Sequence, residues 1–259
     1  MNANSFVKHH GPLIAQDLPR LEVLNYICEQ VEGVTTARVL HVDKRRHTVT
    51  YEHLALKEPM NSKAEDLDAM SKVGRLLAKM HAAKFPPPNE LSEEPYPLES
   101  LGIDYRDAKI LANALPPGWF HSDFWHGNVF TPDGSNIMVI DPLPAAFMFS
   151  RKYILASGAL DVAMMYMSLL LLHPLIKQYC LSVPTQVTAA ETFLTSYLEQ
   201  RDACSKQVVV ALRRVILRLA DTWISALSTR LAWPIYTAKK ARATQLIVNL
   251  KESEEWIKI

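Results

Sequence analysis

The segment His121-Ser-Asp-Phe-Trp-His-Gly-Asn128, followed by Asp141, groups side chains that can support metal-assisted chemistry. Its spacing is H-x-D-x-x-x-x-N, with a second aspartate after a short apolar run. Carboxylate and amide oxygens are the ligands that Mg²⁺ prefers, and one or two of them suffice when water and phosphates complete the coordination shell. The carboxylate of Asp123 could accept the proton of an attacking hydroxyl. The pattern therefore predicts phosphoryl transfer, with Asp123 as base and Asn128 and Asp141 as metal ligands.

A β-hairpin is expected to bring the two metal ligands together. Val129-Phe130 and Ile137-Met-Val-Ile140 are β-prone and flank Thr131-Pro-Asp-Gly-Ser135, a tight-turn sequence. The midpoint between Asn128 and Asp141 falls at 134.5, inside this turn. We therefore expect Asn128 to lie opposite Asp141 at the open end of the hairpin.

Two other interpretations of these residues are open. His121, Asp123 and His126 have side chains that suit a catalytic zinc or manganese ion, which would make the protein a metallohydrolase. That interpretation gives Asn128 and Asp141 no role, and the chain has no other His/Asp cluster with ligand spacing. Asp and Asn side chains also often make local hydrogen bonds in turns without any catalytic function.

The remaining patterns predict a small mixed lobe followed by a larger helical one. Within residues 1–55 we expect a short strand at 5–8 and a helix at Arg20–Gln30. A hairpin should follow, with strands at 39–42 and 48–54. Residues 56–259 contain a helix from Ser62 to Ala83, then the Asp123 segment, and are helical from Ala159 almost to the end. We expect an α+β, bilobal fold with one lobe at 1–55 and the other at 56–259.

Composition excludes several classes of protein. With 259 residues, 49% of them hydrophobic, the chain can bury a substantial core. A formal charge of +1 does not predict a nucleic-acid partner. The longest apolar stretch, Val162 to Leu172, is about half of a membrane span and indicates a buried helix. Three widely spaced cysteines and the lack of an apolar signal core at the N-terminus favour a cytoplasmic protein.

The chain resembles the aminoglycoside phosphotransferase and choline kinase family, whose fold is similar to that of protein kinases. Four segments carry the resemblance, namely His121–Asn128, Val139-Ile-Asp-Pro142, Gly74–His81 and Ala159-Leu-Asp-Val-Ala163. The Asp-x-Trp and Asp-Pro variants are most similar to fructosamine kinases. The resemblance implies a protein-kinase-like fold, ATP and Mg²⁺ as cofactors, and a small-molecule hydroxyl acceptor such as a sugar, an aminoglycoside or an amino-alcohol.

The resemblance also implies roles for residues of the small lobe. Lys8 would contact the ATP phosphates and form an ion pair with Glu22 on the following helix. The backbone of the hinge, at Glu52, His53 and Leu54, would bind the edge of the adenine ring.

Two residues of the larger lobe would act as supports. Asp161 would brace the catalytic loop by hydrogen bonds from the N-terminal end of a helix, where an acidic side chain is favoured. His121 would pack and hydrogen-bond beneath the loop, a structural role.

The chain departs from the family pattern at its start. The family has two strands and a glycine-containing loop before the lysine strand, whereas only seven residues precede Lys8 and no G-x-G-x-x-G motif is present. We therefore expect a truncated small lobe. A truncated chain, a minimal kinase whose pocket other segments or a partner close, and a catalytically silent binding module are all open. Pro142-Leu143 follows Asp141 without an Ala-Pro-Glu motif, which favours a small-molecule acceptor over a protein substrate.

Overall fold

The computed structural model describes residues 5–52, 66–85, 94–131, 136–142, 152–171 and 183–227. The helices within these ranges are α1 (Ile14–Gln30), α2 (Leu67–Ala82), α3 (Tyr105–Ala114), α4 (Ala159–Leu171), α5 (Val183–Gln200) and α6 (Lys206–Leu227). The strands are β1 (Ser5–His9), β2 (Val34–Thr35), β3 (Val39–Asp43), β4 (Thr48–Glu52), β5 (Gly118–Trp119), β6 (Val129–Phe130), β7 (Ile137–Val139) and β8 (Leu155–Ala156).

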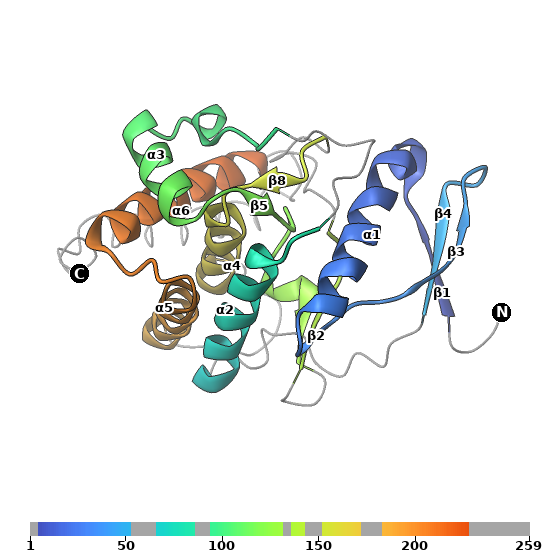
Figure 1. The fold of residues 1–259 in the computed structure, drawn as a ribbon, viewed down its shortest axis with the longest axis horizontal. Coiled ribbons are helices and arrows are strands. Elements are labelled where there is room, and N and C mark those ends of the chain that lie inside the picture. The colour runs from blue at the N-terminus through green and yellow to red at the C-terminus, as the bar shows by residue number, and fades with distance from the viewer. Residues whose placement is uncertain are drawn as a thin grey trace.

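A three-stranded antiparallel sheet, in the order β1-β4-β3, lies at one end of the molecule (Figure 1). The β3–β4 hairpin confirms the prediction for this segment, and the Asp43 carboxylate accepts backbone hydrogen bonds from Arg45 and Arg46 at its tip. Val49 and Tyr51 of β4 pack with Ile14 and Leu21 of α1 in a small core. These contacts position β1, the strand that carries Lys8.

Helix α1 begins six residues earlier than the predicted start at Arg20 and continues through Pro19. A proline inside a helix removes one backbone hydrogen bond, so the sequence suggested a boundary there. The burial of Ile14, Asp17 and Pro19 offsets this loss, because the first turns of α1 pack into the protein. The prediction of the helix was right and that of its start was wrong.

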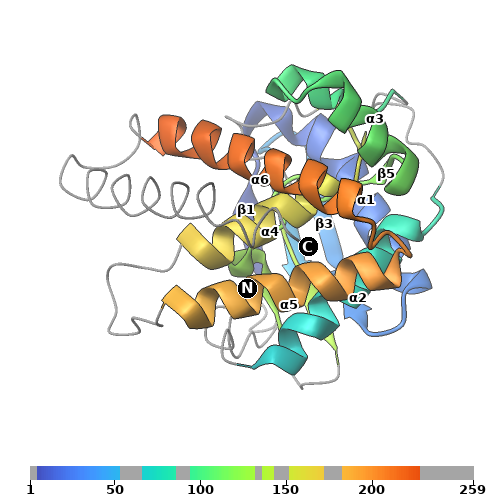
Figure 2. The ribbon, with the colours of Figure 1, turned by 90° about the vertical axis from the view of Figure 1, so that its left-hand side faces the viewer.

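Helices α2, α4, α5 and α6 surround a second, larger core (Figure 2). Helix α4 is buried along its described side chains, including Val162, Met165 and Leu170, which confirms the predicted buried helix. No helix in the described part of the chain combines the length and apolarity needed to cross a membrane. Helix α1 contributes Leu24 and Ile27 to this core, so α1 packs against both the small core and the large one.

Two short strand pairings connect distant parts of the chain. β2, from the first 52 residues, pairs in parallel with β7, and β7 pairs antiparallel with β6. β5 pairs with β8 and places the residues that lead into the His121 segment beside the start of α4. Neither β2, β5 nor β8 was predicted, because two residues are too few to show an alternating pattern and none of the three belongs to a recognised hairpin, as the two-residue β6 does.

Candidate functional site

The β6–β7 hairpin forms as predicted, but its register differs by one residue. Val129 lies opposite Val139, and the amide of Ile140 donates to the carbonyl of Asn128 at 3.1 Å. Asn128 therefore lies opposite Ile140, and Asp141 is the next residue along the chain. Asp141 follows the end of β7, and its φ of +56° lies in the left-handed region that few non-glycine residues adopt. Residues 132–135, where the turn is predicted, lie outside the described residues.

Asp123 and Asn128 are hydrogen-bonded to each other within the segment His121–Asn128, which we call the Asp123 loop. The Asn128 amide nitrogen donates to Asp123 Oδ2 at 2.9 Å and to the Asp123 carbonyl at 3.0 Å. Asn128 is 7% exposed and belongs to a single helical turn that leads into β6. These hydrogen bonds fix the orientation of the Asp123 carboxylate at the open end of the hairpin.

The environment of Asp123 makes its carboxylate unusually basic. Burial raises its pKa to about 7, because desolvation disfavours the charged form. The hydrogen bond from Asn128 and the positive charge of Lys8 lower the pKa, whereas the charges of Asp141 and Asp161 raise it. A carboxylate with a pKa near neutrality is suited to accept a proton at physiological pH.

Lys8 and Asp141 form an ion pair of 2.5 Å between Lys8 Nζ and Asp141 Oδ1, with side chains 33% and 35% exposed. The predicted partner of Lys8 was Glu22, which is also among the described residues but lies exposed on α1. Glu22 follows the buried Leu21 by one residue, a rotation of about 100° that turns its side chain toward solvent. The predicted Lys8–Glu22 pair is therefore not formed, and Lys8 instead connects β1 to the hairpin.

Asp161, in the first turn of α4, holds the start of the Asp123 loop. Its carboxylate accepts from the amides of His121 at 2.6 Å and Ser122 at 2.9 Å, and it contacts His81 Nε2 of α2 at 3.0 Å. Asp161 is fully buried, so these donors compensate for the removal of its charge from water. The expected bracing role of Asp161 is thus seen directly in its contacts.

Comparisons with known proteins agree with this geometry at the level of the fold. Neither the scan against protein-family models nor the search of curated proteins finds a match. The chain is similar to the crystal structure of a choline/ethanolamine kinase family protein from Mesorhizobium loti, with a TM-score of 0.60 and 13% identity over 99% of this chain and 85% of the other. The chain has a protein-kinase-like fold.

Two further structures show the same relationship. Choline kinase from Cryptosporidium parvum Iowa II has a TM-score of 0.59 at 12% identity, over 92% of this chain and 78% of the other. A glucosamine kinase in complex with glucosamine, ADP and inorganic phosphate has a TM-score of 0.59 at 16% identity, over 98% and 78%. The bilobal, α+β, protein-kinase-like architecture expected from the sequence is therefore confirmed.

His121, the first residue of the Asp123 loop in this kinase-like fold, is fully buried. Its Nε2 is 2.9 Å from the Ile140 carbonyl, and its Nδ1 accepts from the Asp123 amide at 3.3 Å. Burial lowers the pKa of His121 to about 4, so the ring is neutral and donates through Nε2. His121 thus links the Asp123 loop to the hairpin, in agreement with the structural role expected for it.

The zinc interpretation of this segment is not supported by the arrangement of its side chains. Both ring nitrogens of His121 already have partners, and His126 is buried with its own amide bonded to Ser168 Oγ. Within the described ranges, no three His, Cys, Asp or Glu side chains are grouped so that they could hold a metal ion.

The structure describes only part of the predicted hinge. Glu52 is the last residue of β4, and its carboxylate lies 3.7 Å from Arg38 Nε. His53 and Leu54 lie outside the described residues. Their proposed contact with adenine stays a prediction.

Several buried polar residues around the site were not predicted. His10, between the sheet and α1, lies 3.0 Å from Asp17 and 2.9 Å from the Tyr51 hydroxyl. Arg20 of α1 is also fully buried and reaches Ser122. Charged residues are usually exposed, so nothing local in the sequence distinguishes these from solvated helix residues.

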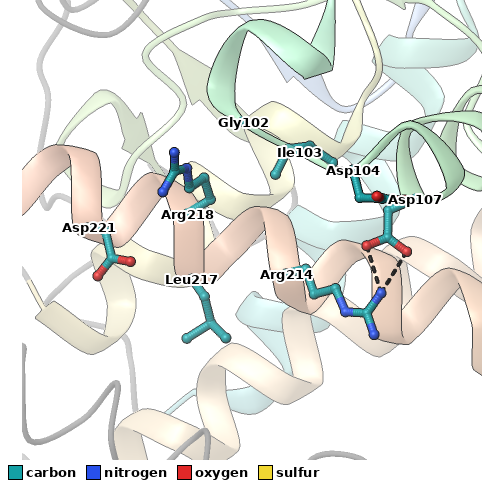
Figure 3. Close-up of a pocket in the computed structure, with 8 residues that line it drawn as sticks. All are labelled: Gly102, Ile103, Asp104, Asp107, Arg214, Leu217, Arg218 and Asp221. Carbon is teal, nitrogen blue, oxygen red and sulfur yellow. Dashed lines mark hydrogen bonds and ion pairs between the residues drawn. The ribbon is translucent and has the colours of Figure 1, made fainter.

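A separate hollow of about 460 Å³ lies between α6 and the segment that leads into α3 (Figure 3). Arg214 and Asp107 face each other across it, with Arg214 Nη1 at 2.9 and 2.7 Å from the two carboxylate oxygens. None of the predicted site residues lines this hollow. The Asp107–Arg214 pair holds α3 against α6.

Proposed function

We propose that the protein is an ATP- and Mg²⁺-dependent phosphotransferase that phosphorylates a hydroxyl of a small molecule. The observation that carries this proposal is the meeting of Asp123, Asn128 and the Lys8–Asp141 ion pair at the open end of one hairpin. These residues come from separate segments of the chain, and their types match the parts that phosphoryl transfer requires, namely a base, oxygen ligands and a cation. The kinase-like fold is consistent with this chemistry.

The side chains at the hairpin fit a magnesium ion better than an ion that needs a full set of protein ligands. The Asn128 amide nitrogen donates to Asp123, so the amide oxygen is the atom that can face a cation. Asp141 supplies a partly exposed carboxylate beside it. One amide oxygen and one carboxylate are sufficient for Mg²⁺, which keeps water and substrate phosphates in its remaining positions. When bound, the ion would neutralise charge on the phosphates.

In the proposed reaction, Asp123 acts on the acceptor. Its carboxylate accepts the hydroxyl proton while the hydroxyl oxygen forms a bond to the γ-phosphorus of ATP, and the bond from that phosphorus to ADP breaks. Asn128 keeps the carboxylate in position through its amide nitrogen. Burial of Asp123 keeps the pKa of the base close to neutrality, which favours this proton transfer.

Lys8 would bind the nucleotide phosphates. In the present structure Lys8 contacts Asp141. Its ammonium group can release this carboxylate and bind a phosphate oxygen instead, because both partners are negatively charged. Because Lys8 lies on β1, this contact would also hold the small sheet against the nucleotide.

The proposal is tested by a nucleotide-consumption screen with Mg²⁺-ATP and pools of sugars, amino-alcohols and aminoglycosides. We expect at least one pool to increase ATP consumption by the wild type and to yield a phosphorylated acceptor in mass spectrometry. Asp123→Asn is the matched control, because it preserves the size of the side chain and removes the base. Equal consumption by the wild type and Asp123→Asn would contradict the assignment of the base.

A catalytically silent kinase-like binding module is the second candidate. The ion pair between Lys8 and Asp141 favours it, because this contact satisfies both side chains without any ligand. The two candidates differ in turnover, since a silent module would bind acceptor or nucleotide and leave ATP unconsumed.

A further inference from the structure

Arg20 is the largest charged side chain that the described part of the protein buries completely. It lies on α1 and is 0% exposed. Removing a guanidinium group from water is costly unless the group is well paired, so its burial calls for specific contacts. Two of its contacts are with residues that lead into the proposed base.

The guanidinium group touches the chain on both sides of His121. Arg20 Nη1 donates to the Ser122 hydroxyl at 3.1 Å. Its central carbon lies 5.4 Å from the centroid of the Phe120 ring, within the range of a cation–π contact. Arg20 therefore fixes both the entry to the Asp123 loop and the residue immediately before Asp123.

Ser122 needs such support because of its backbone. Its φ is +67°, a conformation that is uncommon for serine and persists only where surrounding contacts impose it. The Ser122 amide donates to Asp161 Oδ1 at 2.9 Å, and its hydroxyl donates to the His121 carbonyl. The hydroxyl thus donates its single proton to the His121 carbonyl and accepts a hydrogen bond from Arg20.

Two helices therefore hold this residue from different directions. Asp161 belongs to α4 of the larger lobe, and Arg20 belongs to α1, which also packs against the small sheet. A shift of α1 would pull on Ser122 and so move Asp123.

We propose that Arg20 is a positioning residue, which holds Ser122 in its left-handed conformation and thereby couples the placement of α1 to the placement of the Asp123 carboxylate. This inference depends on the proposed function in one respect, namely that Asp123 is the base. The structural part, that Arg20 stabilises the Asp123 loop, can be tested without any nucleotide.

The first variant is Arg20→Met, which removes the guanidinium group and keeps much of the aliphatic volume. Its matched control is Arg213→Met, because Arg213 is another buried arginine, 3% exposed, whose Nη2 lies 3.3 Å from both Glu191 carboxylate oxygens of α5. Both variants lower the melting temperature, since each removes the hydrogen bonds of a buried guanidinium group. Only Arg20→Met should affect the Asp123 loop.

Hydrogen–deuterium exchange measures the loop directly in the protein without nucleotide. The amides of His121 and Ser122 donate to Asp161, so they are protected while the turn is held. We expect exchange in peptides that cover residues 119–125 to become about tenfold faster or more in Arg20→Met and to stay unchanged in Arg213→Met. Equal exchange in the two variants would overturn the proposal.

Ser122→Ala provides a second variant in case Arg20→Met does not fold. It removes the oxygen that Arg20 contacts and leaves the arginine in place. With Mg²⁺-ATP and water as acceptor, both variants should lower kcat by about 10–100-fold with little change in the KM for ATP, because they misplace the base without touching the nucleotide. Wild-type loop exchange and wild-type kcat in Ser122→Ala would also overturn the proposal.

The double variant and the wild type separate the remaining outcomes. Arg20→Met with Ser122→Ala should lower kcat by less than the product of the two single losses, because both changes break the contact between Arg20 and Ser122. Losses that multiply fully would overturn the coupling. If the wild type consumes no ATP with water or with any acceptor pool of the screen, the proposed function fails, whereas the exchange measurements still decide whether Arg20 holds the loop.

Discussion

At the scale of single residues, the proposed chemistry depends on the carboxylate of Asp123, whose pKa some neighbouring groups raise and others lower. Burial and the neighbouring charges of Asp141 and Asp161 make Asp123 more basic, while Asn128 and Lys8 oppose this shift. The result is a pKa of about 7, close to the value at which a general base works best near neutral pH. The hydrogen bond from Asn128 matters for orientation as well as for the pKa.

Asp123→Asn should lower turnover by about 10²–10⁴-fold, the usual contribution of a general base, and leave the affinity for Mg²⁺-ATP nearly unchanged. The amide oxygen of asparagine can still accept the hydrogen bond from Asn128, so the loop should keep its conformation. Steady-state kinetics with the acceptor from the screen, together with calorimetric titration of Mg²⁺-ATP, measure the two effects. A comparable loss of nucleotide affinity would show that Asp123 has a different role.

Asp123 should also make stability depend on pH. Its pKa is about 7 in the folded protein, above the ordinary value of 3.8, so the folded state binds more protons than the unfolded state between these values. Stability from this group is present at low pH and is lost as pH rises through about 7, with an upper limit of about 4 kcal/mol. Thermal unfolding without metal should therefore show Asp123→Asn gaining stability relative to wild type as pH rises. A pH-independent difference between the two proteins would contradict this assignment.

At the scale of elements, α4 and the β6–β7 hairpin hold the site in place. Asp161 at the start of α4 satisfies two backbone amides and lies beside His81 of α2. Asp161→Ala leaves these buried groups without an acceptor and should cost about 3–5 kcal/mol of unfolding free energy. Urea denaturation measures this loss. As a comparison, Asp221→Ala on the exposed side of α6 should change stability by less than about 0.5 kcal/mol.

The close packing of α2 on α5 gives a second prediction at this scale. A Cβ atom at Gly74 would clash with the Phe193 carbonyl oxygen and lie 3.0 Å from the Tyr197 amide nitrogen, both of the α5 backbone. Gly→Ala in a helix interior normally stabilises by about 1 kcal/mol, but here the two helices would have to separate. We expect Gly74→Ala to destabilise the protein by about 1–3 kcal/mol in chemical denaturation. Stabilisation, as expected at an uncrowded helical site, would mean that the two backbones are less close.

Local patterns in the sequence predicted most elements and the central residues of the site. The spacing of Asp123, Asn128 and Asp141, the two hairpins and the buried α4 all depend on short-range signals. Helix α3 could also have been predicted, because Asp104 caps it and Asp107 lies in its first turn. The hairpin register was wrong by one residue because it depends on the conformation of the turn, which composition alone does not fix.

The remaining errors concern contacts between distant segments. Whether Lys8 meets Glu22 or Asp141 depends on which face of α1 is turned toward the sheet, and this is decided by packing across the protein. The burial of Arg20 depends on the same packing. Such contacts leave no local signal, since the sequence around a buried arginine looks like that around an exposed one.

At the scale of the whole molecule, α1 is the element that connects the parts. It supplies Ile14 and Leu21 to the small core and Leu24 and Ile27 to the large one, and it carries Arg20 to the Asp123 loop. The parallel pairing of β2 with β7 adds a second connection between the first 52 residues and the hairpin. We expect the small sheet and the hairpin to respond together when a ligand binds between Lys8 and Asp141.

Thermal unfolding with Mg²⁺-ATP tests the central claim most directly, because it requires no acceptor. A ligand that binds the folded state stabilises it by about 2.7 kcal/mol at a hundredfold excess over its Kd. We predict that ATP and Mg²⁺ together raise the melting temperature of the wild type more than either alone, and that Asp141→Ala loses the Mg²⁺-dependent part while Asp221→Ala keeps it. The absence of any shift in the wild type at millimolar Mg²⁺-ATP would contradict the proposed phosphotransferase.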